Sequence, residues 1–486
     1  MIGLLLVLAQ SPTVTVTGGR VAGVVAPSGI REFRGIPFAA PPVGPLRWKA
    51  PQAVIPWSGV KDASAFGPRC MQDYIYTDMQ FRSPGFSEDC LTLNVWAPPR
   101  GKGKLPVLLY FYGGGFLAGD ASEFRYDGEH MARRGIVVVT ANYRLGVFGF
   151  LAHPELTAES PHHASGNYGL LDQVAALQWV RDNIAAFGGD PAQITIGGES
   201  AGSVSVNLLM VSPLSRNLIA GAIGESGGVI APATLDSAER IGAAFGPLAA
   251  LRAIPAAALL DRGEGHHFPV TVDGWFLPEA PAAILAAGQQ ARVPLLVGWN
   301  AAEGSWKAIA GDSAPTPERY AAGVQRLYGS DAGPVLRAFP GGDSNEVKES
   351  GTLHAGARFT ALDTWTWARL AARTGDKPVF VYNYTRSRGD RGAVHSAEIE
   401  YALGNLGTNH VYDWAADDWT VSETMQAYFA AFIKTGSPNA TGLPGWPANN
   451  QPAAPVMILD VHPHAAPSTF APAFAVLDSL NAKASH

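Results

Sequence analysis

The sequence lacks a basic excess and a long apolar run. Its 35 Lys and Arg side chains stand against 41 Asp and Glu, which leaves a formal net charge of −6. Without a basic excess to neutralise phosphates, nucleic-acid binding and attachment to an anionic membrane surface are both disfavoured. No run reaches the roughly 18 apolar residues that a membrane span needs. We therefore expect no nucleic-acid partner and no membrane-spanning segment.

Cysteine is scarce, since the chain has only Cys70 and Cys90. If oxidised, a bridge closing their loop of about twenty residues would stabilise the fold by roughly 3 kcal/mol. Residues 1–12 begin with the apolar stretch Ile2–Ala9 and are a possible signal remnant, although a basic n-region is missing; a strand or a leader is the alternative. An export segment and an even cysteine count favour secretion or the periplasm, with unrelated thiols in a cytoplasmic protein as the alternative.

Signs of disorder and of internal repeats are also absent. Hydrophobic residues make up 47% of the chain and charged residues 16%, which is enough apolar material for a large core. The 55 Gly and 37 Pro indicate many loops but follow no strict period. Because no charged linker divides the chain, residues 13–486 are expected to form a single domain.

Short apolar runs alternate with helical patterns along the chain. Apolar runs rich in β-branched residues favour strands that are covered on both faces, and they predict strands at Leu105–Phe111, Gly135–Ala141, Gln193–Ile196, Val293–Gly298 and Val379–Tyr384. Helical periodicity predicts helices over Tyr168–Phe187 and Ala201–Met210. This alternation predicts an α/β fold with a mostly parallel sheet.

A serine motif lies between a predicted strand and a predicted helix. The residues Gly198 to Gly202 read Gly-Glu-Ser-Ala-Gly and fit the pattern G-x-S-x-G. A serine on such a turn has strained backbone and an exposed Oγ, and glycines are needed where strand and helix nearly collide. Ser200 is therefore the candidate nucleophile. A similar stretch around Ser226 does not open a helix, so Ser226 is expected to give supporting hydrogen bonds.

A nucleophilic serine also needs N–H donors for the oxyanion that forms on the substrate. One donor in this architecture is the backbone N–H of the residue after the serine, here Ala201. A glycine loop after the strand that ends at Phe111 can turn its N–H groups toward a bound carbonyl without interference from side chains. We therefore predict that Gly114 and Gly115 complete an oxyanion hole.

Four further blocks follow one another along the chain, and they are Phe33–Phe38, Leu46–Trp48, Ser87–Val95 and Asn142–Gly146. Together with the serine motif they resemble the type-B carboxylesterases, the α/β-hydrolase family that includes cholinesterases and bacterial para-nitrobenzyl esterases. The resemblance implies an α/β-hydrolase fold with a large central sheet flanked by helices, and segments rich in Ala and Pro predict helical insertions around 231–290 and 310–375. It also implies that Cys70 pairs with Cys90.

In α/β hydrolases the triad follows the order serine, acid, histidine. Residues 300–305 follow a predicted strand and resemble the family's acid loop, so Glu303 is expected to orient the histidine and stabilise its charged form. Residues 392–399 resemble the family's histidine loop, so His395 is expected to take the Ser200 proton and pass it to the leaving group.

Several residues beside the predicted triad have more than one interpretation. The family more often has Gly where Ser396 stands, which leaves the assignment of His395 intact but narrows the space beside the imidazole. Glu199 resembles the family residue that tunes the gorge electrostatically, with a structural carboxylate as the alternative. The adjacent histidines at 162–163 and 266–267 have no further ligand at zinc-like spacing, so we expect no metal and no cofactor.

The motifs and the resemblance predict a serine carboxylic-ester hydrolase that acts on apolar or aryl esters, as small-molecule substrates, through an acyl-enzyme. A monomer or a weak dimer is expected. The same triad could serve amides, carbamates or lactones, which differ mainly in the leaving group. A non-catalytic binding protein of the same fold is a further alternative, although Ser200, Glu303 and His395 are all present.

Overall fold

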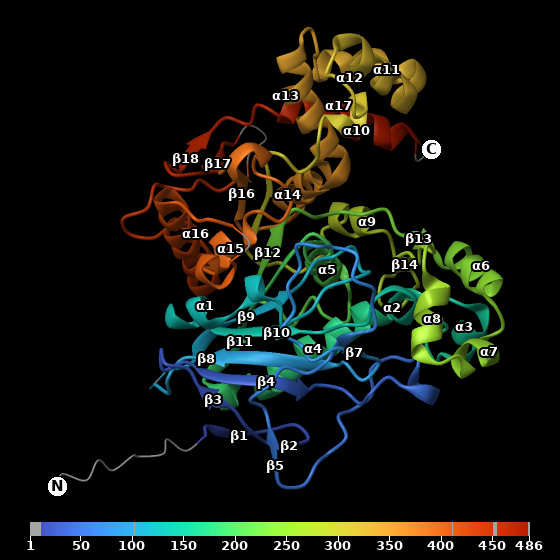
Figure 1. The fold of residues 1–486 in the computed structure, drawn as a ribbon, viewed down its shortest axis with the longest axis vertical. Coiled ribbons are helices and arrows are strands. Elements are labelled where there is room, and N and C mark those ends of the chain that lie inside the picture. Colours follow the sequence, from blue (N-terminus) through green and yellow to red (C-terminus); the bar gives the residue numbers. More distant parts are fainter. Residues whose placement is uncertain (1–10, 102, 411, 451–453, 485–486) are drawn as a thin grey trace.

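The computed structural model describes residues 11–101, 103–410, 412–450 and 454–484. Within these residues, eleven strands form one central sheet in the order β18-β17-β16-β15-β12-β11-β9-β10-β8-β4-β3, and helices flank it (Figure 1). Seven neighbouring strands run parallel, in the order β17-β16-β15-β12-β11-β9-β10. The antiparallel pairs lie at the two ends of the sheet. The predicted α/β fold with a mostly parallel sheet is confirmed.

The strands of the central sheet vary in length. In chain order they are β3 (Val24–Val25), β4 (Arg31–Pro37), β8 (Thr92–Ala97), β9 (Leu105–Phe111), β10 (Val137–Ala141), β11 (Gly189–Glu199), β12 (Gly221–Glu225), β15 (Leu295–Asn300), β16 (Val379–Tyr384), β17 (Val456–Leu459) and β18 (His464–Ala466). Smaller sheets pair β1 (Thr13–Val16) with β2 (Gly19–Ala22) and β5 (Val60–Asp62), β6 (Arg69–Cys70) with β7 (Phe86–Ser87), and β13 (Ala233–Thr234) with β14 (Thr271–Val272).

The middle of the sheet carries the core. In β9 the side chains from Val107 to Phe111 are each at most 2% exposed, and so both faces of this strand are buried. A strand covered on both faces needs apolar residues in succession instead of alternation, which explains the continuous apolar run in the sequence.

Helices connect and cover the strands. The larger ones on the central body are α4 (Tyr168–Asn183), α5 (Ala201–Val211) and α16 (Ala416–Thr435), with shorter helices α1 (Glu129–Arg133), α2 (Gly146–Phe150), α3 (Pro154–Glu159) and α15 (Ile399–Leu403). The helix predicted to reach Phe187 ends at Asn183, because its last turn tightens to a 3₁₀ helix over Ile184–Phe187. Gly188, with φ of 96°, stops that turn in the left-handed conformation.

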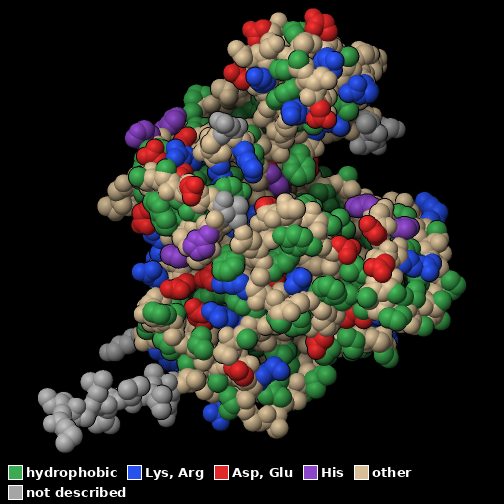
Figure 2. Space-filling model, viewed as in Figure 1, with side chains coloured by type: hydrophobic (Ala, Val, Ile, Leu, Met, Phe, Trp, Pro, Cys, Tyr) green, Lys and Arg blue, Asp and Glu red, His purple; other side chains and the backbone are tan. Residues whose placement is uncertain are grey.

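The segments predicted as insertions are helical. The first holds α6 (Leu235–Phe245), α7 (Leu248–Ala253), α8 (Ala256–Gly263) and α9 (Pro281–Ala286). The second holds α11 (Pro317–Tyr328), α12 (Ala332–Ala338), α13 (Ser344–Gly356) and α14 (Leu362–Thr374), preceded by α10 (Lys307–Ala310). Helices α10 to α13 form a lobe with α17 (Ala471–Ala484), and α6 to α8 lie on the other side of a hollow in the molecular surface (Figures 1 and 2).

The surface and the helices bear on the expected partners. Acidic and basic side chains are interspersed on the face shown in Figure 2. Among the described residues, no helix is both long and apolar enough to cross a membrane. Residues 1–10 of the possible signal remnant lie outside the described residues.

Cys70 and Cys90 form a disulfide, the pairing that the family resemblance implies. Both residues are buried, and the pair β6 and β7 lies at the base of the loop that the bridge closes.

Replacing Cys70 and Cys90 together by Ala should lower the free energy of unfolding by about 3 kcal/mol, because the unfolded chain regains the freedom of a loop of some twenty residues. Urea unfolding of the variant and of the oxidised wild type measures this difference, and wild type in reductant is the control. Equal midpoints for the variant and the oxidised wild type would contradict the expectation.

Candidate active site

Five neighbouring strands bring one segment each to a common edge of the sheet (Figure 1). The carboxyl ends of adjacent parallel strands meet at one edge, which is where open α/β sheets bind ligands. In the order of the sheet, β16 leads to His395, β15 to Glu303, β12 to Ser226, β11 to Ser200, and β9 to Gly113–Gly115.

Ser200 occupies a sharp turn between β11 and α5. Its backbone has φ of 55° and ψ of −122°, an unusual conformation for a residue with a side chain. A Cβ at Gly198 would lie 2.5 Å from the carbonyl carbon of Gly202, and a Cβ at Gly202 would lie 2.1 Å from the carbonyl oxygen of Phe111. Glycine is therefore required at both positions, as the motif predicts.

Ser200, His395 and Glu303 form one hydrogen-bonded chain. His395 Nε2 lies 2.9 Å from Ser200 Oγ, and His395 Nδ1 lies 2.6 Å from Glu303 Oε2. Ser200 and His395 are half-buried, whereas Glu303 is buried. The hydroxyl remains reachable from solvent, and the carboxylate that orients the imidazole is shielded.

The loops that carry the acid and the histidine are joined to each other. Ala302 and Val394 form an isolated parallel bridge, and the Ala302 amide donates to the Ala393 carbonyl at 2.9 Å. Each member of this bridge is next in sequence to Glu303 or His395. The bridge therefore fixes the distance between the two side chains.

Glu303 is held by a second layer of polar groups. Its Oε1 accepts from the backbone N–H of Asn300 at 2.7 Å and from the Ser226 hydroxyl at 2.5 Å. Ser226 Oγ also lies 2.9 Å from Glu398 Oε1, and Asn300 Nδ2 donates to Glu398 Oε2. Ser226 thus joins Glu303 to Glu398 in one buried network.

Glu398 had no predicted role, although it stands three residues after His395. Burial raises its pKa to about 8, and the carboxylates of Glu199 and Glu303 add to that effect. Ser226 has a single proton, which it gives to Glu303. A protonated Glu398 completes the network by donating to Ser226 Oγ while accepting from Asn300.

Glu398→Gln should reduce the loss of stability between pH 5 and pH 9. The folded-state pKa of about 8 lies above the ordinary value of 4.5, so stability from this group is full below 4.5 and is lost as pH rises through 8. Glutamine keeps a donor and an acceptor but does not titrate. Urea unfolding at several pH values measures the effect, and parallel curves for variant and wild type would contradict it.

A second carboxylate, Glu199, lies beside the imidazole. Its Oε1 is 3.2 Å from His395 Nε2 and accepts from the Ser396 hydroxyl at 2.5 Å. Burial alone lowers the pKa of His395, but Glu199 and Glu303 raise it above its ordinary value. The two carboxylates therefore stabilise the imidazolium that forms when His395 takes a proton.

The predicted oxyanion donors belong to the glycine loop after β9 and to the residue that follows Ser200. The amides of Gly114, Gly115 and Ala201 donate to no acceptor among the described residues. Gly113 packs against the nucleophile, since a Cβ there would lie 3.0 Å from Ser200 Cβ. Gly114 and Gly115 have φ of 112° and 63°, conformations that favour glycine.

Two aromatic side chains border the site. Phe359 lies in a π-helical turn, Ala357–Ala361, between α13 and α14, and its ring meets the His395 ring edge-on with centroids 4.8 Å apart. Phe359 is nevertheless 54% exposed. The Tyr76 hydroxyl lies beside Gly115, because a Cβ on that glycine would be 3.2 Å away. Both rings are placed to contact a bound substrate.

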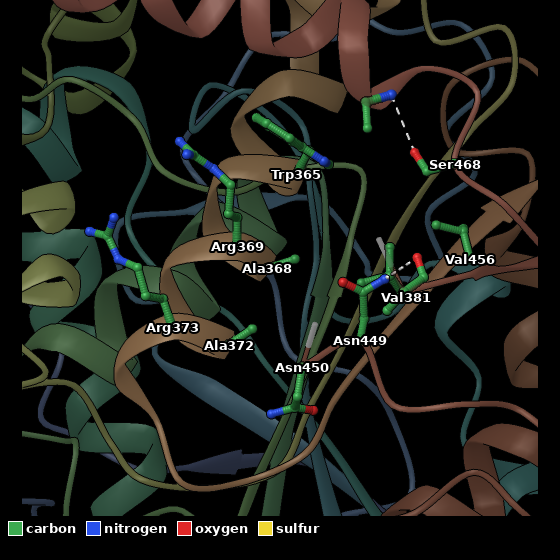
Figure 3. Close-up of a pocket in the computed structure, with 12 residues that line it drawn as sticks. Trp365, Ala368, Arg369, Ala372, Arg373, Val381, Asn449, Asn450, Val456 and Ser468 are labelled. Carbon is green, nitrogen blue, oxygen red and sulfur yellow. Dashed lines mark hydrogen bonds between the residues drawn. The ribbon is translucent and has the colours of Figure 1, made fainter. Parts of the chain in front are cut away.

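Other candidate clusters lie elsewhere. The His162 ring stacks on Trp275 with centroids 3.8 Å apart, and His266 packs against Phe245. Among the described residues, no group of three or more His, Cys, Asp or Glu side chains could hold a metal ion. A cavity of about 380 Å³ between α14, β16 and β17 contains none of the predicted site residues (Figure 3).

Comparison with known proteins places the chain among esterases. It matches the model of the carboxylesterase family over residues 10–326 and 341–475. It is 37% identical over 457 residues to a fumonisin B1 esterase of Sphingopyxis macrogoltabida, covering 88% of this chain and 83% of the relative.

Two further relatives come from distant organisms. A para-nitrobenzyl esterase of Bacillus subtilis is 34% identical over 92% of this chain and 94% of its own length. A human cocaine esterase is 34% identical over 92% of this chain and 89% of its own length. The similarity therefore extends over nearly the whole chain and is not confined to the serine motif.

Proposed function

Since the chain belongs to the carboxylesterase family and is a carboxylic ester hydrolase, we propose that it cleaves apolar or aryl esters through an acyl-enzyme formed on Ser200. The observation that carries this proposal is the hydrogen-bonded chain from Ser200 Oγ through His395 to Glu303. A nucleophile, a base and a group that orients the base are the parts that acyl transfer requires.

In the first half of the reaction, Ser200 Oγ attacks the ester carbonyl carbon while His395 Nε2 takes the hydroxyl proton. Glu303 holds the imidazole with Nε2 free to accept and stabilises the positive charge that forms. The imidazolium then gives its proton to the alkoxide as the bond to the alcohol breaks. Ser200 is left as an ester of the acyl group.

In the second half, water attacks the acyl carbon and His395 takes one of its protons. The same proton returns to Ser200 Oγ as the acid leaves. In both halves the carbonyl oxygen becomes an oxyanion that accepts from the amides of Gly114, Gly115 and Ala201. One such donor is typically worth about 3 kcal/mol of transition-state stabilisation.

The preference for apolar or aryl esters is proposed from the surroundings of the site. Phe359 and Tyr76 offer aromatic surface next to His395 and Gly115. Three relatives are named for fumonisin B1, para-nitrobenzyl esters and cocaine. Aromatic and aliphatic walls with a few fixed polar groups are typical of sites that bind apolar ligands.

Hydrolysis of p-nitrophenyl esters from acetyl to long acyl chains tests the proposal. We expect turnover that depends on chain length, and the preferred length gives the size of the acyl pocket. Matched amide, carbamate and lactone substrates identify the alternative chemistries. Inertness toward the whole ester series, with turnover of one of the other classes, would overturn the preference for apolar or aryl esters.

The proposal includes an oxidising compartment and a monomeric or weakly dimeric state. The buried disulfide supports secretion or the periplasm, because such bridges persist where thiols are not kept reduced. Fractionation of the producing cells tests the location, and light scattering over a range of protein concentrations tests the assembly. A cytoplasmic location with free thiols would contradict the first part.

A further inference from the structure

Ser396 has an unfavourable backbone conformation. Its φ is 64°, in the left-handed region that is unfavourable for a residue other than glycine. Ser226 and Ser200 are the other serines with positive φ among the described residues, and both make hydrogen bonds at the site. By analogy, the Ser396 hydroxyl is also expected to make a hydrogen bond at the site.

That partner is Glu199, whose Oε1 accepts from the Ser396 hydroxyl at 2.5 Å. The same oxygen lies 3.2 Å from His395 Nε2, the nitrogen that lies 2.9 Å from Ser200 Oγ. Glu199 is 2% exposed, so water contributes little to its solvation. The hydrogen bond from the Ser396 hydroxyl replaces part of the stabilisation that water would give the carboxylate.

Opposing effects act on the pKa of Glu199, which is raised overall. Burial raises its pKa, whereas the charge of His395, the hydrogen bond from Ser396 and the charge of Arg125 lower it. Glu303 opposes them with a like charge. The other titratable groups that interact with Glu199 are Tyr76, Tyr110, Tyr126, Tyr143, Glu225, Tyr382 and Glu398.

We infer that Ser396 is a positioning residue whose hydroxyl keeps Glu199 a carboxylate beside the imidazolium of His395, and so stabilises the charge that forms there during ester cleavage. This inference rests on the proposed roles of Ser200 and His395. It assigns a function to a side chain at a position where the family more often has glycine.

The variants Ser396→Ala and Ser396→Gly distinguish the effect of losing the hydroxyl from the effect of relieving the backbone strain. Both remove the hydrogen bond, but only glycine relieves the strain at φ of 64°. Loss of a hydrogen bond to a charged group should lower kcat about tenfold in both variants. The acid limb of kcat/KM against pH should move to lower pH in both, because a Glu199 that protonates more readily raises the pKa of His395 less.

Glu199→Gln provides the second arm of the test. Adding Ser396→Ala to Glu199→Gln should change neither kcat nor the acid limb, because the group on which the hydroxyl acts no longer titrates. Thermal unfolding checks that each variant is folded. If Ser396→Ala does not fold, Ser396→Gly carries the comparison alone.

Three results would overturn the inference. They are an unchanged acid limb in both Ser396 variants, wild-type behaviour of Ser396→Gly beside an impaired Ser396→Ala, and an undiminished effect in the Glu199→Gln background. Failure of the proposed function is recognised separately, by undiminished turnover in Ser200→Ala and by the absence of Ser200 labelling with a serine-reactive phosphonate.

Discussion

Ser200→Ala should reduce kcat for p-nitrophenyl esters by roughly 10⁴- to 10⁶-fold. The variant keeps the amides of Gly114, Gly115 and Ala201 but has no atom that can form the acyl-enzyme. His395 Nε2 then has Glu199 as its remaining close partner, at 3.2 Å, and no hydroxyl proton to take. Residual turnover would come from binding and from the oxyanion donors alone.

Initial rates at saturating substrate, with active-site titration of the wild type, measure this loss. Ser479→Ala, on an exposed position of α17, is the matched control and should keep full activity. A serine-reactive phosphonate should add its mass to the peptide that contains Ser200 in wild type and to no peptide in Ser200→Ala. A loss of less than about tenfold would mean that another residue supplies the nucleophile.

Glu303→Gln should reduce kcat by about 10⁴-fold while the protein stays folded. Two donors, the Asn300 amide and the Ser226 hydroxyl, point at Glu303 Oε1 and will hold the glutamine oxygen. The amide nitrogen of the glutamine then faces His395 Nδ1 and donates to it. The imidazole proton is forced onto Nε2, which can no longer accept the proton of Ser200.

The pH dependence of kcat distinguishes this explanation from simple disruption of the site. If the wrong tautomer is the cause, activity should remain low at every pH at which the protein is folded. Glu264→Gln, the same substitution at an exposed position, is the control. A loss below about tenfold would indicate that Glu199, not Glu303, is the carboxylate on which His395 depends.

Much of this architecture could be predicted from the sequence. Continuous apolar runs identified β9, β15 and β16, because strands buried on both faces need no alternation. The Ser200 turn could be predicted because the serine and its two glycines form a local motif between a strand and a helix, although the contact that requires glycine at 202 is with the distant Phe111. Glu303 and His395 were reached through the resemblance and the ends of strands, since a lone glutamate or histidine carries no local signal.

The network behind Glu303 could not be predicted in the same way. Ser226 and Glu398 are 172 residues apart, and their contact depends on the packing of β12 beside the segment before α15. Nothing in the residues around Glu398 distinguishes it from a glutamate on the surface. Only its burial in the folded protein does so. Likewise the contact between Ser396 and Glu199 spans 197 residues. The sequence showed a serine where the family more often has glycine, but it could not show that Glu199 is the partner of that serine.

The five strand ends carry the groups that react, and the helical segments lie apart from them, so the two parts can change in sequence independently. The groups that react are attached to neighbouring strands whose register is fixed by the sheet, whereas the helical segments from α6 to α9 and from α10 to α14 are added beyond those ends. Laboratory evolution toward new esters should therefore accumulate its gains in the helical segments. The strand ends would stay invariant, and one chemistry would serve a widening range of substrates.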